Sequence, residues 1–102
     1  MAYRREARIQ SEILGYLGSI PKSFWFKAQL TNAGGVPDIC GTYRGLSVYF
    51  EVKRPGEMPR KLQKHRHDQI ENAGGFAFVV RSLRDTQECM KTLDQYIIQK
   101  GL

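Results

Sequence analysis

Two short segments of the chain carry the residue types from which a metal site for phosphate chemistry can be built. Asp38 follows Gly35-Val36-Pro37, and Glu51 precedes Val52-Lys53. Two carboxylates that face one another bind hard divalent cations such as Mg²⁺, which prefers oxygen ligands and keeps several waters. Such an ion lowers the pKa of water and neutralises charge on a phosphate under attack. These residues therefore indicate metal-assisted hydrolysis, provided that the fold brings the two acids together.

A β-hairpin between the two segments meets that condition. A turn at Arg44-Gly45 pairs Tyr43 with Leu46 and so fixes the strand register. Each step away from the turn lowers one residue number by one and raises the other by one, so Asp38 lies opposite Glu51. Directly opposed residues of antiparallel strands have Cβ atoms about 4.5–5.5 Å apart. Because side chains alternate along a strand, Lys53 lies on the same face as Glu51. We expect two acids and a lysine to converge there.

The order and spacing of these motifs resemble those of the PD-(D/E)xK nuclease superfamily, and more narrowly its VRR-NUC branch. The resemblance rests on Gly-Val-Pro-Asp ending at Asp38, Glu-Val-Lys beginning at Glu51, and Gln63 followed by Ala73-Gly74-Gly75. It runs from about residue 6 to residue 84. It implies an endonuclease that hydrolyses DNA phosphodiester bonds and depends on Mg²⁺, with Mn²⁺ as a substitute.

The resemblance also implies roles for individual residues. We expect Asp38, Glu51 and Glu6 to hold the metal, together with the backbone of Val52. Beside the metal, the ammonium of Lys53 can orient the attacking water or stabilise the pentavalent phosphate. All of these except Val52 are expected to be catalytic, and Gln63 joins them through a hydrogen bond to the water or to a phosphate.

The first predicted helix, from Arg4 to Leu17, offers two acids for the site. On a helical wheel the apolar stripe that ends at Leu17 is centred almost on Glu6, whereas Glu12 points roughly 120° away. A carboxylate on a buried stripe needs a partner, and the metal cluster supplies one. The alternative for Glu6 is an exposed place in the first turn, where it favours the helix dipole. Glu12 is the second candidate.

The second predicted helix, from Pro59 to about Ala73, offers two glutamines. Gln63 and Gln69 both flank its apolar stripe, and only the spacing to Gly74 favours Gln63. The same region is the most basic part of the chain, which is suited to contacts with phosphates or forms only a solvated helix face. The residues predicted to contact DNA are Arg54, Arg60, Lys61, Lys64 and Arg66.

Length and composition limit the number of domains, the class of partner and the location of the protein. A chain of 102 residues predicts one domain, residues 1–102, with a single core. Sixteen basic and ten acidic residues give a net charge of +6, which favours a polyanionic partner. Cys40 and Cys89 define neither a disulfide framework nor a zinc site, and no signal or membrane-spanning segment is evident. We expect a soluble cytoplasmic protein with no membrane contact and no small-molecule cofactor.

The predicted elements follow the order α-β-β-β-α-β-α, which is an α/β fold of the restriction-endonuclease type. Strands are expected at Ser23–Leu30, Pro37–Tyr43, Leu46–Lys53 and Phe76–Val80, and a last helix at Asp85–Lys100. A strand reached through a crossover helix lies parallel to its neighbour, so we expect a mixed sheet with helices on both faces. The apolar run of the last strand is typical of burial on both sides.

Phe24, Trp25 and Phe26 are suited to stacking on bases, but at strand spacing they are more often part of a core. For the whole molecule, the resemblance implies a homodimer that acts on branched DNA such as Holliday junctions. The alternatives are a non-catalytic nucleic-acid-binding module of the same fold and the nuclease component of a restriction or repair system.

Overall fold

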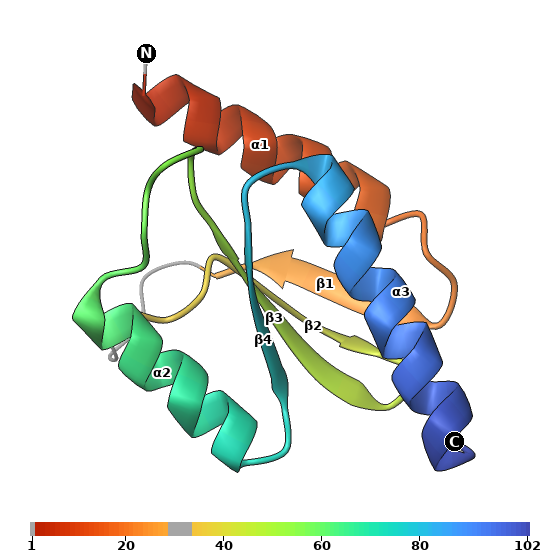
Figure 1. Ribbon diagram of the computed structural model, residues 1–102. Coiled ribbons are helices and arrows are strands. Elements are labelled where there is room, and N and C mark those ends of the chain that lie inside the picture. Colours follow the sequence, from red (N-terminus) through yellow and green to blue (C-terminus); the bar gives the residue numbers. More distant parts are fainter. Residues whose placement is uncertain (1, 29–33) are drawn as a thin grey trace.

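The computed structural model of the chain describes residues 2–28 and 34–102 (Figure 1). Within these ranges it forms three helices and one sheet of four strands, in the predicted order α-β-β-β-α-β-α. In chain order, the elements are α1 (Ala2–Leu17), β1 (Ser23–Lys27), β2 (Ile39–Tyr43), β3 (Leu46–Val52), α2 (Lys61–Asn72), β4 (Phe76–Val80) and α3 (Leu83–Lys100).

The hairpin of β2 and β3 has the predicted register. Its last pair toward the site is Ile39 with Phe50, so the next step outward places Asp38 opposite Glu51. The turn residues Arg44 and Gly45 have positive φ angles of 49° and 86°. Such a two-residue turn matches the twist of the strands, and glycine adopts the left-handed conformation without steric cost.

The sheet has the order β1-β2-β3-β4. β1, β2 and β3 are antiparallel neighbours, whereas β4 runs parallel to β3. A parallel pair needs a crossover connection, and α2 supplies it. The predicted mixed sheet is therefore confirmed.

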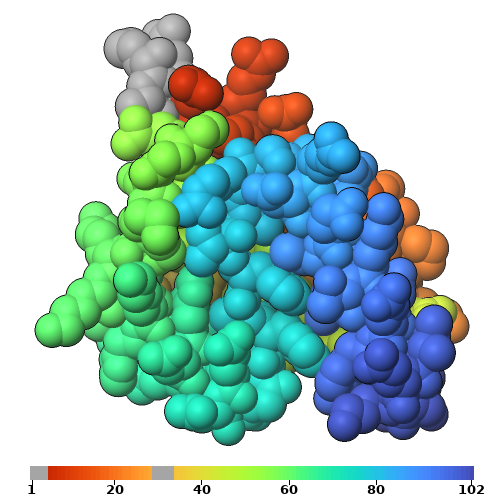
Figure 2. All heavy atoms as spheres, in the orientation of Figure 1, coloured from red at the N-terminus to blue at the C-terminus, as the bar shows by residue number. Residues whose placement is uncertain are grey.

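Helices cover both faces of the sheet, as predicted (Figure 1). α1 and α3 pack on one face, which carries the main core, and α2 packs on the other face against β4. In the space-filling view, α3 in blue and α2 in green occupy much of the visible surface (Figure 2). The fully buried core residues include Ile13, Leu17, Ile39, Val48, Phe50, Val52, Val80 and Leu93.

The ends of three elements differ from the prediction. β1 ends at Lys27 instead of residue 30, although residues 29 and 30 and part of the predicted loop, 31–33, lie outside the described residues. β2 begins at Ile39, two residues later than predicted, and β3 ends at Val52, one residue earlier. The residues left out of these two strands include Asp38, which lies in a bend just before β2, and Lys53, which directly follows β3.

Local capping explains the two helix starts. α2 begins at Lys61 and not at Pro59, because the backbone N–H of Arg60 donates to Oε1 of Gln63 at 2.7 Å and Arg60 thereby becomes the cap. α3 begins at Leu83, two residues before the predicted start. There the hydroxyl of Ser82 accepts a hydrogen bond from the backbone N–H of Asp85 at 3.1 Å.

Two predictions about burial are wrong. The residues of β4 are only partly buried except Val80, because β4 is an edge strand and has a neighbour on one side only. Of the three aromatic residues on β1, Trp25 packs on the core face, 5.7 Å from the ring of Phe50 between centroids. Phe24 and Phe26 point to the other face and are exposed.

Both cysteines, Cys40 and Cys89, are free thiols. Within the described ranges, every helix is too short or too polar to cross a membrane.

Candidate active site

Asp38 lies just before β2, where three strands meet. Its backbone carbonyl accepts a hydrogen bond from Ala28 beyond the end of β1, at 2.8 Å. Its side-chain Oδ2 accepts a second one from the backbone N–H of Val52 on β3, also at 2.8 Å. The Pro37 ring before it is fully buried. The Gly-Val-Pro-Asp segment therefore holds this carboxylate in place against the strand that carries Glu51.

Glu51 is a buried acid on the α2 side of the sheet, with 2% of its surface exposed. Its Oε2 accepts a hydrogen bond from Nε2 of Gln63 at 3.1 Å and lies 3.8 Å from Nζ of Lys53. Its Oε1 is buried and has no hydrogen-bond partner among the described residues. An unpaired buried carboxylate oxygen is costly, and a cation that coordinates it removes that cost.

The charges at the site favour a further cation. Burial, followed by the neighbouring carboxyl of Asp38, raises the pKa of the Glu51 carboxyl to about 8, although Lys53 opposes this shift. Lys53 is itself buried, with 5% exposed. One ammonium thus faces two neighbouring carboxylates, which leaves the pair short of positive charge. The residues present therefore fit a divalent metal ion.

Glu6 lies near this pair and Glu12 does not share its surroundings. Glu6 is half-buried, and its pKa is raised by burial, by Glu57 and by Asp38. Glu12 is exposed, as the helical wheel predicts. In the described part of the chain, however, no three His, Cys, Asp or Glu side chains form a cluster that can hold a metal. Two carboxylates with water and substrate oxygens suit Mg²⁺, which rarely uses an all-protein cage.

The structure places Gln63, and not Gln69, at the carboxylate pair. Gln63 is buried, and its side chain joins Glu51 to the first turn of α2. Gln69 is exposed and accepts a hydrogen bond from Nη1 of Arg66 at 2.8 Å. A close backbone contact fixes the start of α2: at Gly35, with φ of 75°, a Cβ atom would come within 2.8 Å of Cγ of Leu62.

The five basic residues predicted to contact DNA have different surroundings. Arg60, Lys61 and Lys64 are exposed around the start of α2. Arg54 forms an ion pair with Glu57, with its Nη2 3.5 Å from Oε2. Nε of Arg66 donates to the carbonyl of Gly34 at 2.7 Å and so anchors the segment before Asp38.

Sequence reasoning missed one polar residue on the buried side of α1. Gln10 is 8% exposed, and its Oε1 has no hydrogen-bond partner among the described residues. It lies one turn after Glu6 and one turn before Ile13, so the buried side of the helix runs through positions 6, 10, 13 and 17. The i, i+4 spacing from Glu6 is the signal that reveals it.

Comparisons with known proteins agree with this architecture. No protein-family profile and no curated protein matches the sequence. A solved structure described as "VRR_NUC domain" superposes with a TM-score of 0.68 and 25% sequence identity, over 85% of this chain and 95% of the other. A second, "VRR_NUC domain protein", gives a TM-score of 0.68 and 16% identity, over 90% of this chain and 87% of the other. Over most of its length, the chain therefore folds as a VRR-NUC domain.

Proposed function

We propose that the chain is a Mg²⁺-dependent endonuclease that hydrolyses phosphodiester bonds of DNA, with Asp38 and Glu51 as its metal-binding carboxylates. The likeness to VRR-NUC structures supports a nuclease-type domain. The observation that carries the finer proposal is the buried Oε1 of Glu51, which has no partner in the described part of the chain. Mn²⁺ substitutes for Mg²⁺ because both accept carboxylate and water oxygens.

Each residue of the site has a distinct task in this proposal. When bound, Mg²⁺ would lower the pKa of a coordinated water and neutralise negative charge on the scissile phosphate. Asp38 and Glu51 hold the ion, together with the backbone of Val52, and Glu6 adds negative charge nearby. Lys53, with its Nζ 3.8 Å from Oε2 of Glu51, stabilises the charge that develops on the phosphate oxygens.

Gln63 acts in this proposal as a positioning residue. Its Nε2 donates to Glu51 and its Oε1 accepts from the backbone of Arg60, so both ends of the amide are engaged within the protein. It fixes the orientation of the Glu51 carboxylate and leaves Oε1 of that group available as a metal ligand. Hydrogen bonds from a second layer of residues commonly orient metal ligands in this way.

The substrate that we propose is branched DNA, such as a four-way junction, cleaved by a homodimer. A protomer of 102 residues offers one site, whereas two protomers related by a two-fold axis present two sites to a two-fold substrate. The exposed cations Arg60, Lys61 and Lys64 supply contacts to phosphates beside the carboxylate pair. Arg54 and Arg66 add positive charge at the two ends of this region.

A panel of linear, flapped and four-way DNAs tests the proposal. We expect cleavage in Mg²⁺ and in Mn²⁺, no cleavage in excess chelator, and binding with slow turnover in Ca²⁺, which holds looser geometry and polarises water less. The four-way DNA should be cut fastest. Undiminished cleavage in chelator would overturn the metal mechanism, and equal rates on all three DNAs would overturn the selectivity.

A further inference from the structure

The edge strand β1 carries two exposed phenylalanines on the face of the sheet that also carries the carboxylate pair. Phe24 and Phe26 are 69% and 50% exposed, and their ring centroids are 6.2 Å apart. Trp25 between them points into the core on the opposite face. Apolar rings of this size are normally buried on folding, so two of them side by side at the surface indicate a contact with another molecule.

The strand register places these rings next to the candidate active site. Phe26 pairs with Cys40 on β2, and Cys40 pairs with Tyr49 on β3, so the three residues form one row across the sheet. The neighbouring row contains Asp38 and Glu51. Rows on the same face are two residues apart along each strand, about 7 Å, and adjacent strands are about 5 Å apart. Phe26 therefore lies roughly 10 Å from the carboxylate pair across the sheet.

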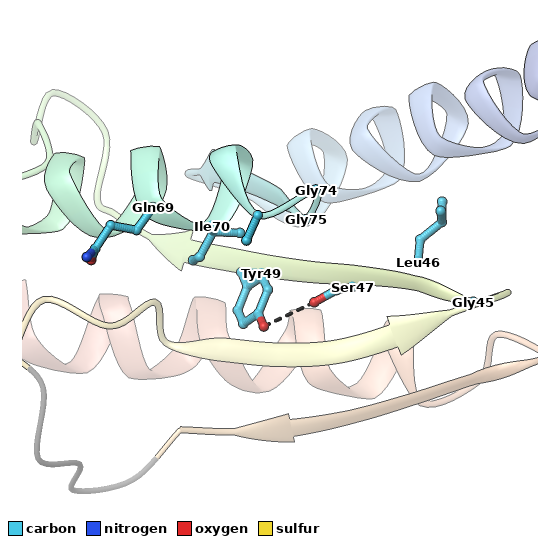
Figure 3. Close-up of a pocket in the computed structure, with 9 residues that line it drawn as sticks. Gly45, Leu46, Ser47, Tyr49, Gln69, Ile70, Gly74 and Gly75 are labelled. Atoms are coloured by element: carbon cyan, nitrogen blue, oxygen red, sulfur yellow. Dashed lines mark hydrogen bonds between the residues drawn. The ribbon is translucent and has the colours of Figure 1, made fainter.

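This part of the face is bordered by α2 on one side only. α2 packs against β4, and in the close-up β2 and β1 extend past Tyr49 with none of the described helices in front of them (Figure 3). Tyr49 and Ser47 lie on this side with their hydroxyls 3.0 Å apart, and they line a hollow beneath Gln69 and Ile70. The two exposed rings and the row of Cys40 and Tyr49 thus lie on the same face of the sheet as the carboxylate pair. We call the surface formed by Phe24 and Phe26 the aromatic face.

The charges near the aromatic face favour a polyanion and disfavour a second copy of the chain. Lys22 lies just before β1, and the exposed Arg44 is hydrogen-bonded through its backbone N–H to the carbonyl of Lys22 at 3.0 Å. Antiparallel pairing of β1 with β1 of a second copy would place Lys22 of one copy near Lys27 of the other. Lysines on an edge strand oppose such pairing.

We propose that the aromatic face binds an unpaired, single-stranded segment of the substrate, with bases stacked on Phe24 and Phe26. This inference rests on the proposed nuclease function and specifies which part of the DNA lies beside the cleaved bond. A phenyl ring has no donor or acceptor with which to read a paired base edge, but it stacks on any base whose face is free. Flapped DNA carries such unpaired bases beside the branch, and a four-way DNA exposes them when base pairs at the branch open.

Binding measured without cleavage tests the inference. Fluorescence anisotropy compares a labelled oligothymidylate with a duplex of the same length, in chelator and at one fixed salt concentration. Phe24→Leu/Phe26→Leu keeps the apolar volume but removes both stacking faces, and we expect at least about fivefold weaker binding to the single strand. Binding to the duplex should change by less than about twofold, because phosphate contacts dominate it.

Two control variants sharpen the result. Phe24→Tyr/Phe26→Tyr keeps both ring faces and should bind the single strand as the parent does. Ile98→Ala removes an exposed apolar side chain from α3, 77% exposed on the far side of the sheet, and should change neither affinity. Circular dichroism checks the fold of each variant, which surface substitutions should leave intact.

Several outcomes would overturn the inference. These are undiminished single-strand binding by the leucine variant, equal losses on single strand and duplex, a loss in the tyrosine variant, or a loss that light scattering traces to a broken dimer. The nuclease proposal fails separately: selective single-strand binding without any cleavage would remove that proposal alone. Cleavage of branched DNA, combined with binding that does not depend on Phe24 and Phe26, would remove only the proposal for the aromatic face.

Discussion

Glu51 illustrates how a buried carboxylate without a full set of partners costs stability. The fold buries this carboxylate beside a second one, satisfies Oε2 with Gln63 and Lys53, and leaves Oε1 without a partner among the described residues. A chain selected only for stability would carry an apolar residue at such a position. Costly polar burial of this kind is concentrated at functional sites.

Glu6 and Glu12 provide the first prediction at the scale of single residues. Glu6→Gln should raise the Mg²⁺ concentration needed for half-maximal cleavage by about 3- to 10-fold. The reason is that Glu6 lies close enough to Asp38 for the charge of Asp38 to raise the pKa of Glu6. Glu12→Gln should leave that concentration unchanged, since Glu12 is exposed. Metal titrations of cleavage by the two variants decide the question. The reverse ranking would mean that Glu12 serves the site.

The thiol of Cys89 gives a prediction about pH. Burial, reinforced by Asp85, raises its pKa from 9.0 to about 11. Only the thiolate reacts with iodoacetamide, so at pH 7–9 the folded protein should have about a hundredfold less reactive thiolate than an ordinary cysteine. Alkylation followed by mass spectrometry should be slow at pH 8 and should accelerate with rising pH. Equal rates in buffer and in urea at pH 8 would contradict the shift.

Helix α2 links the site to the rest of the fold at the scale of secondary structure. The amide of Gln63 caps the first turn of the helix and holds Glu51, so the position of the helix and the orientation of the carboxylate depend on one side chain. Gly35 brings the Gly-Val-Pro-Asp loop against the same turn. Loop, helix and strand thus form one unit around the carboxylate pair.

A matched pair of variants on α2 tests this link. Gln63→Ala should lower cleavage about 10- to 100-fold, because it removes the hydrogen bond that orients the Glu51 carboxylate. It should also lower the free energy of unfolding by about 1 kcal/mol through loss of the cap. Gln69→Ala should change neither quantity. Cleavage rates and urea unfolding of both variants provide the comparison, and equal effects would show that Gln63 has no special role.

The hairpin register was predictable because a two-residue turn at Arg44-Gly45 leaves one arrangement for all the pairs beyond it. The buried side of α1 followed from its period, apart from Gln10. Exposure at the sheet edges was not predictable in the same way. A strand with an alternating or apolar sequence has the same residue pattern at the edge of a sheet and in its centre. The sequence therefore predicted more burial for β4 and Phe24 than they have. The exposure of these residues depends on the strand order and on the placement of α2, which are tertiary properties.

Within the carboxylate site, the types and spacing of the residues predicted the meeting of Asp38, Glu51 and Lys53. They did not separate Gln63 from Gln69 on the helix stripe, since both flank it. The separation depends on how α2 lies across β3 and β4, which is a tertiary property. The roles assigned to these residues in metal binding and catalysis stay predictions.

At the scale of the whole molecule, we expect a homodimer in solution. One chain of 11.7 kDa provides one carboxylate site, and symmetric cleavage of a four-way DNA requires two. Light scattering across a range of concentrations should give a mass of twice that value. A mass of 11.7 kDa at concentrations where four-way DNA is cut symmetrically would contradict the dimer.

The most direct test of the account is the rate at which Glu51→Gln cleaves four-way DNA in saturating Mg²⁺. The substitution keeps the shape of the side chain and removes the charge that we assign to the metal. We predict a rate at least about a hundredfold below that of the parent chain, with DNA binding held within about threefold by the basic residues of α2. Cleavage at the parental rate would contradict the assignment of Glu51 to the metal site.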